Sequence, residues 1–190
     1  MNMTIRLQLS VMMFLQFFVW GSWYVIMGTY LGQGLQFPGP SIGWAYATTA
    51  IAAIISPFFV GMIADRFFAA QKVMAAMHLL GGVMLYLSTT VTDTTLFFWI
   101  LLLHTLCYMP TLALVNAISF NQMTDVAKEF PGIRVIGTIG WIAAGLLISF
   151  IDTAFEMNIE PTNIPFKMGA AVSILLGLYC FTLPNTPPKG

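Results

Sequence analysis

The stretch LSVMMFLQFFVWGSWYVIMGTYL, residues 9–31, contains no charged side chain and decides the fold class of this chain. A bilayer core about 30 Å thick is crossed by a helix of about 20 mostly apolar residues, so this stretch predicts a membrane-spanning helix. It is longer than the apolar core of a secretory signal, which has about 7–15 residues, and no small-residue cleavage site follows it. We therefore expect it to stay in the chain as a helix.

The composition of the whole chain is that of a membrane protein. Of 190 residues, 58% are hydrophobic and 7% are charged, and the mean hydropathy is +0.86. Soluble domains carry about 25% charged residues, so this chain cannot build a water-soluble surface. The net charge is zero and no run of basic residues occurs, which argues against a nucleic-acid partner.

The cysteines and histidines do not indicate a metal site or a catalytic centre. Cys107 and Cys180 lie far apart inside apolar stretches, so we expect neither a disulfide framework nor a thiolate metal site. His78 and His104 are isolated histidines, and we expect neither to bind a metal. No predicted span holds a nucleophile with its base or paired carboxylates, so the sequence predicts neither an enzyme nor a cofactor.

Further apolar stretches follow the first and are separated by short polar or Pro/Gly-rich segments. We expect one bundle over residues 1–190, with six spans at residues 9–31, 41–64, 73–91, 95–119, 132–151 and 165–183. Ser41 is expected to cap the second span, and Pro131 to lie in the first turn of the fifth. The predicted fold class is all-α, a polytopic membrane protein.

The basic residues predict which way the bundle faces. With six spans, one side of the membrane receives nearly all of them, namely Arg6, Arg66, Lys72, Lys128 and Lys189. Lys167 is the only basic residue on the opposite side. Positively charged loops stay in the cytoplasm, so both termini of this chain are expected there.

The segment after the second span has a recognisable motif. GMIADR at residues 61–66, followed by Lys72, resembles the loop motif G-x-x-x-D-[RK]-x-G-[RK]-[RK] of the major facilitator superfamily. We expect Gly61 to allow close helix approach, Asp65 to face a helix N-terminus, and Arg66 and Lys72 to hold the cytoplasmic end shut. A phenylalanine and two alanines depart from the motif's second half. The alternative is an ordinary turn with topology charges.

The fifth predicted span carries the most informative polar residues. Arg134, Thr138 and Trp141 share one helix face, which offers a cation, a hydroxyl and an indole. A charged residue in a span is costly unless it faces a cavity or a partner, so this face is a candidate for the transport pathway. The alternative for Arg134 is to snorkel to the nearby membrane surface. Small residues suited to close helix contact form a separate surface: Gly137, Gly140 and Ala144, with Gly21 and Gly28 in the first span.

The first and fourth spans add further polar and aromatic candidates. Gln16, Trp20, Trp23 and Met27 follow helical spacing, so one face carries an amide and two indoles. Tryptophan often marks a membrane interface, but these two lie near the middle of their span. In the fourth span Asn116 can hydrogen-bond either to a substrate or to a neighbouring helix.

Together these segments resemble the N-terminal half of a nucleoside:proton symporter of the NupG and xanthosine-permease type, within the major facilitator superfamily. The resemblance covers nearly the whole chain. It is carried by residues 14–17, 20–23, 61–66, 108–112, 116–119, 130–134 and 137–140.

The resemblance implies a nucleoside site that uses Arg134, Thr138 and Trp141, where the family often has Phe in place of the last. An indole still offers a stacking face for a nucleobase. Gln16, Trp20 and Trp23 are second contributors by position, and Asn116 is a further candidate.

The resemblance also implies the partners. They are nucleosides and protons, the lipid bilayer of the bacterial cytoplasmic (inner) membrane, and a six-helix C-terminal half that this chain does not contain and that carries the proton-coupling acid. The expected function is nucleoside transport by proton symport. The alternatives are a stand-alone six-helix subunit for binding or assembly, and a major facilitator transporter for another small polar solute.

Overall fold

Every secondary-structure element in the described part of the chain is a helix. The computed structural model describes residues 1–188, except for the side chain of Asp65. Six of its helical segments are long and apolar enough to cross a membrane, as predicted. The first consists of α1 (Met3–Trp23), α2 (Met27–Thr29) and the π-helical turn η1 (Tyr30–Gly34). The others are α3 (Gly39–Arg66), α4 (Ala70–Ser88), α5 (Thr94–Asn121), α6 (Val126–Phe155) and α7 (Ile164–Tyr179), the last extended by the 3₁₀ turn η2 (Cys180–Thr182).

Helices suit this sequence because lipid offers no hydrogen bonds to the main chain. Every backbone N–H and C=O in the bilayer must be paired inside the protein, and a helix does this within one segment. Asp93 begins α5 by accepting a hydrogen bond from the Leu96 N–H at 2.8 Å. Such a cap satisfies one of the donors that a helix start leaves free.

Three predicted helix ends are wrong. The α3 helix begins at Gly39 after Pro38, so Ser41 is not its cap. The α6 helix begins at Val126, because the Asp125 side chain caps it by accepting from the Lys128 N–H, and Pro131 lies inside the helix. The α3 helix also continues to Arg66, so residues 61–66 form its last turns and not a loop.

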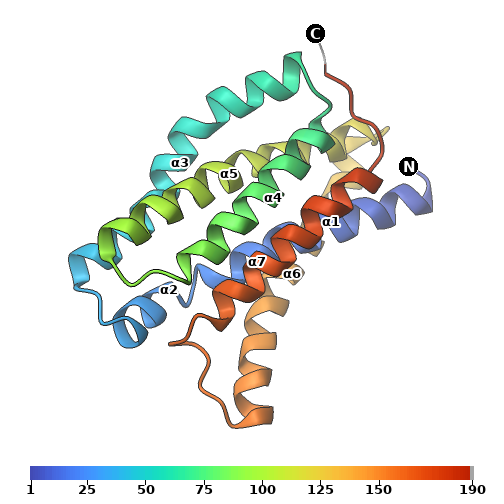
Figure 1. The fold of residues 1–190 in the computed structure, drawn as a ribbon. Helices are drawn as coiled ribbons and strands as arrows, with labels where there is room; N and C mark the ends of the chain where they lie inside the picture. The colour runs from blue at the N-terminus through green and yellow to red at the C-terminus, as the bar shows by residue number, and fades with distance from the viewer. Residues whose placement is uncertain (189–190) are drawn as a thin grey trace.

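The helices form a row of neighbours that runs α3, α5, α4, α7, α1, α6 (Figure 1). The two helices at the ends of the row are the least enclosed. Within the apolar windows of α3 and α6 only 22% of residues are buried, against 44–56% in the other four spans. These two helices therefore expose most of their surface to whatever surrounds the bundle.

Two apolar clusters fill the space between the central helices. One surrounds Met13, Met74 and Val115, and the other surrounds Trp23, Phe97 and Phe166. Both clusters contain side chains of α1, α4, α5 and α7. In lipid such contacts hold helices together by packing, since the surrounding tails are as apolar as the side chains.

The chain enters and leaves the bundle at the same end (Figure 1). Four basic residues lie exposed at helix ends on that side: Arg6 near the start of α1, Arg66 at the end of α3, Lys72 in α4 and Lys128 in α6. Lys189 lies outside the described residues. The positive-inside rule assigns the end that is rich in basic residues to the cytoplasm. This orientation of the bundle in a membrane stays a prediction.

Helices α1 and α6 approach each other through glycines, as the small-residue surface predicted. A Cβ on Gly21 would meet the main chain of Trp141 at 2.9 Å. A Cβ on Gly140 would collide with the main-chain carbonyl of Phe14, and one on Gly137 would lie 2.7 Å from the Phe17 ring. At Gly21 and Gly140 the two backbones are therefore so close that only hydrogen fits between them, and at Gly137 the Phe17 ring fills the space that a Cβ would need.

This contact gives the first test. We expect Gly140→Ala to lower the stability of the natural polypeptide that carries this chain by about 1–3 kcal/mol, because the methyl group meets main chain that cannot turn aside. Thermal unfolding in detergent measures the effect.

The matched control is Gly145→Ala in the same helix, where a Cβ has open space around it. It should keep the melting temperature or raise it, because alanine favours helix over glycine. Equal melting temperatures for the two variants would show that the α1–α6 contact is not tight.

Candidate functional site

An aromatic cluster lies where α1 meets α6. The Trp20 and Trp141 rings are 5.4 Å apart, centroid to centroid, and cross at 87°. Tyr24 lies 5.5 Å from Trp20 and 6.5 Å from Trp141. Both indoles are half-buried, so the cluster is held from behind and is open on one side. Edge-to-face packing of this kind orients aromatic rings and leaves faces free for a flat ligand.

Arg134 extends this open surface along α6. Its guanidinium carbon lies 4.3 Å from the centroid of the Phe17 ring, over the ring face. A cation in that position is attracted to the ring and loses part of its freedom. Among the described residues Arg134 forms no ion pair, and Thr138, one turn further along α6, is exposed. We call the surface made by Phe17, Trp20, Tyr24, Arg134, Thr138 and Trp141 the open face.

Gln16 lies behind the open face and is fully buried. Its amide nitrogen donates to the hydroxyl of Thr111 at 2.8 Å, and its amide oxygen accepts from Nε2 of His78 at 2.7 Å. The Tyr108 hydroxyl donates to the main-chain oxygen of Gln16. The amide is thus paired within the protein, and it joins α1 to α4 and α5.

Trp23 is also fully buried and lies apart from Trp20. Its ring packs against His104 at 5.3 Å and Phe166 at 5.7 Å, inside the bundle. His104 hydrogen-bonds through Nδ1 to the main-chain oxygen of Gly81 at 2.7 Å. The predicted face of the first span is therefore divided, with Trp20 at the open face and Gln16, Trp23 and Met27 in the interior.

Asn116 is separated from the other predicted site residues. It lines a cavity of about 580 Å³ at the end of the bundle that holds both chain ends. The walls of this cavity come from α3, α4, α5 and the segment after η2, and include Ala64, Ala70 and Thr186. None of the α1 or α6 candidates contributes to it.

The predicted gate residues lie at the same end of the bundle. Gly61 does not serve a close helix contact in this half, because a Cβ there would meet nothing within 4 Å. Arg66 and Lys72 are exposed, and the side chain of Asp65 lies outside the described part. The motif is therefore present on a surface that the six helices leave uncovered.

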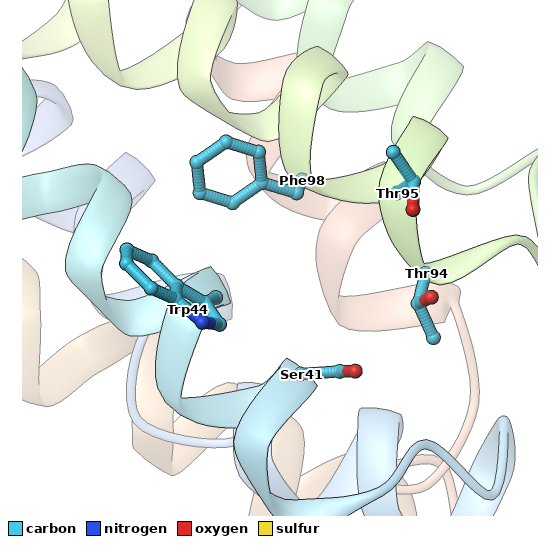
Figure 2. Close-up of a pocket in the computed structure, with 5 residues that line it drawn as sticks. All are labelled: Ser41, Trp44, Thr94, Thr95 and Phe98. Carbon is cyan, nitrogen blue, oxygen red and sulfur yellow. The ribbon is translucent and has the colours of Figure 1, made fainter.

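A second cavity, of about 330 Å³, lies at the opposite end between the starts of α3 and α5 (Figure 2). Trp44 and Phe98 line one side of it, with ring centroids 6.2 Å apart, and the hydroxyl residues Ser41, Thr94 and Thr95 line the other. None of the predicted site residues lines this cavity. An exposed tryptophan beside hydroxyl groups is typical of the membrane–water interface.

Comparison with known proteins decides the family. A family model described as nucleoside H+ symporter matches residues 3–190. The chain belongs to this family. The match therefore confirms the resemblance to this family and the predicted all-helical fold of one transporter half.

Three relatives from Escherichia coli strain K12 show how much of the family pattern is present. The putative nucleoside transporter YegT is 49% identical over 96% of this chain, nucleoside permease NupG 38% over 97%, and xanthosine permease 36% over 97%. This chain covers 43–44% of the length of each relative. It therefore spans less than half of the curated proteins that it matches.

Solved structures agree with the fold. The crystal structure of the nucleoside transporter NupG superposes on 98% of this chain with a TM-score of 0.87 at 38% identity, and a mutant of NupG on 97% with a TM-score of 0.90 at 36% identity. The chain covers 45–46% of those proteins. The six helices of this symporter family member thus correspond to one part of a longer helical transporter.

Several residues of the site are not evident in the sequence. Tyr24 and Phe17 complete the open face, and His78, treated as an isolated histidine, is the partner of Gln16. His78 and Gln16 are 62 positions apart, so no spacing rule connects them. A polar residue in an apolar span is the available signal, since such a residue needs a partner in the bundle.

The pairing of Gln16 and His78 can be tested through stability. We expect His78→Leu to destabilise the natural polypeptide by about 1–3 kcal/mol, because it leaves the Gln16 amide oxygen buried without a donor. The double variant Gln16→Leu/His78→Leu should lose less than the sum of the two single variants, since both polar groups are then removed. Thermal unfolding in detergent gives the comparison, and strict additivity would contradict the pairing.

Proposed function

We propose that this chain is the N-terminal half of a transporter that moves nucleosides across the bacterial cytoplasmic membrane together with protons. The family match over residues 3–190 and the names of the relatives support nucleosides and protons as the transported species. The observation that carries the proposal is the open face, where a guanidinium over the Phe17 ring and two indoles share one surface of the membrane-spanning helices.

The open face suits the two parts of a nucleoside. A nucleobase is flat and apolar on its faces, so it stacks on an aromatic ring such as Trp141 or Trp20. The ribose hydroxyls and base carbonyls accept hydrogen bonds, and Arg134 offers several donors in a fixed plane. Thr138 adds a hydroxyl that can donate or accept.

Gln16 and Trp23 enter this proposal as supports and not as direct contacts. Both are fully buried, and the Gln16 amide already has two protein partners. We propose that they hold α1 in place behind Trp20. Asn116 is proposed to line the cytoplasmic end of the pathway, because its cavity opens among α3, α4 and α5.

The open face needs a second wall. Transporters of this architecture hold substrate between two repeats near the middle of the membrane. The exposure of α3 and α6 supports a C-terminal half that packs against both helices and closes over the open face. We propose that Gly61, Asp65, Arg66 and Lys72 contact this half and close the cytoplasmic end.

Proton coupling is proposed to depend on the C-terminal half. The acidic residues of this chain lie near helix ends or in connections, at Asp65, Asp93, Asp125, Glu129, Asp152, Glu156 and Glu160. A carboxylate that binds and releases a proton during transport is expected deep in a span, beside the substrate. Transport in this proposal requires no covalent step, so the protein acts as a permease. Both ends of this chain lie in the cytoplasm in the proposed orientation.

Uptake of labelled uridine or adenosine tests the proposal. In cells that express the natural polypeptide, we expect uptake that stops when the proton gradient is dissipated. Arg134→Ala should lower uptake about 10- to 100-fold, because hydrogen bonds from a charged donor are lost. Trp141→Phe should keep most of the activity and Trp141→Ala should not, because only the first retains a stacking face.

The matched control is Leu175→Ala, at an exposed position of α7, a helix that contributes no residue to the open face. It should leave uptake unchanged at equal expression. Absence of nucleoside uptake, with uptake of another polar solute that depends on Arg134, would favour a transporter of different specificity. Absence of any uptake would favour a binding or assembly subunit.

A further inference from the structure

The first membrane-spanning segment is interrupted beside the open face. The α1 helix ends at Trp23, residues 24–26 form a turn, and α2 begins at Met27. Ile26 has φ −90° and ψ −2°, in the sparsely occupied region between helix and strand. No proline lies in residues 9–31 to cause this interruption. A break without proline requires another cause, such as a side chain inserted among the helical hydrogen bonds.

Tyr46 of α3 supplies that side chain. The Gly28 N–H donates to the hydroxyl oxygen of Tyr46 at 2.9 Å, and this hydroxyl donates to the main-chain oxygen of Tyr24 at 3.2 Å. In a continuous α-helix the N–H of residue 28 would bond directly to the carbonyl of residue 24. The Tyr46 hydroxyl therefore replaces one helical hydrogen bond by two, and both backbone groups stay paired.

The same tyrosine also holds the side chain of Tyr24. The two rings are 5.3 Å apart and cross at 90°. Tyr24 in turn packs on Trp20 and Trp141. The phenol of Tyr46 thus contacts both the main chain and the ring of a residue at the open face.

Gly28 leaves the room that this hydroxyl occupies. A Cβ at position 28 would lie 3.3 Å from the Tyr46 oxygen and 3.8 Å from its Cε2. A methyl group there would crowd the hydroxyl and favour a helix without it. The glycine at position 28 and the tyrosine at position 46 therefore act as one unit.

We propose that Tyr46 is a positioning residue of the transporter: its hydroxyl keeps the first span open between Tyr24 and Gly28 and thereby sets the Trp20–Tyr24–Trp141 cluster for substrate. Removal of the hydroxyl lets the Gly28 N–H bond directly to Tyr24, which straightens the span and turns the Tyr24 ring. The consequence for substrate rests on the proposed function, whereas the effect on the helix does not.

Hydrogen exchange measured by mass spectrometry tests the helix directly in the detergent-solubilised natural polypeptide. In Tyr46→Phe we expect slower exchange in peptides that cover residues 24–30, because the direct helical bond has replaced the inserted hydroxyl. Tyr86→Phe, an exposed tyrosine on α4, is the matched control and should leave this region unchanged. Unchanged or faster exchange in Tyr46→Phe overturns the proposal.

Transport kinetics test the positioning role. We expect Tyr46→Phe to raise the KM for nucleoside about threefold to tenfold, the range of one hydrogen bond, with a smaller change in maximal rate. Gly28→Ala should act in the same direction. In the Tyr46→Phe background it should add little, because no hydroxyl remains to crowd.

The outcomes separate this inference from the proposed function. Slower exchange with an unchanged KM in an active nucleoside transporter overturns the positioning role. Additive effects of Gly28→Ala and Tyr46→Phe overturn the view that the two residues act as one unit. If the polypeptide transports no nucleoside, the proposed function fails, and the exchange measurement alone decides whether Tyr46 holds the span open.

Discussion

The close contact of α1 with α6 is the constraint on which the rest of the structure depends. Gly21 and Gly140 bring the two backbones together because neither has a side chain to hold them apart, and Gly137 leaves room for the Phe17 ring. This closeness places Trp20 of α1 beside Trp141 of α6 and Phe17 beneath Arg134. A wider separation would divide the open face into two unrelated helix surfaces.

The first span needs support from its other side, because it carries polar groups into the interior of the bundle. Gln16 finds partners on α4 and α5, and Tyr46 of α3 pairs the groups that the break after Tyr24 leaves free. Each of these hydrogen bonds both satisfies a polar group and joins two helices. The first span is therefore held by main-chain contact on one side and by hydrogen bonds on the other.

The distribution of exposed surface agrees with the proposed role of the bundle in transport. The inner helices α1, α4, α5 and α7 bury about half of their apolar windows, whereas α3 and α6 bury far less. The two end helices of the row thus keep exposed surface that a second domain could contact, and one of them, α6, carries part of the open face. A half that is well packed at its centre and exposed at its ends can move as a unit against a partner.

Much of the fold could be predicted from the sequence for a physical reason. Apolar stretches of membrane length must be helical, and the basic residues gather at one end of the bundle. The helical repeat also places Arg134, Thr138 and Trp141 on one face and Gly137 and Gly140 on another, since that repeat is a local property. Helix ends were harder to predict, because the cap at Asp125 starts α6 at Val126, ahead of the position that Pro131 indicated.

Only the tertiary structure decided what each polar residue contacts. Gln16 and His78 meet across 62 positions, and Tyr46 reaches the break after Tyr24 from a different helix. Trp20 and Trp23 differ by three positions, yet one reaches the open face and the other is buried. Helical spacing decides in which direction a side chain points from its helix axis, whereas the burial of that side chain depends on whether another helix lies in that direction. The sequence by itself therefore determined the helices and their candidate faces, and packing decided which of those faces remained open.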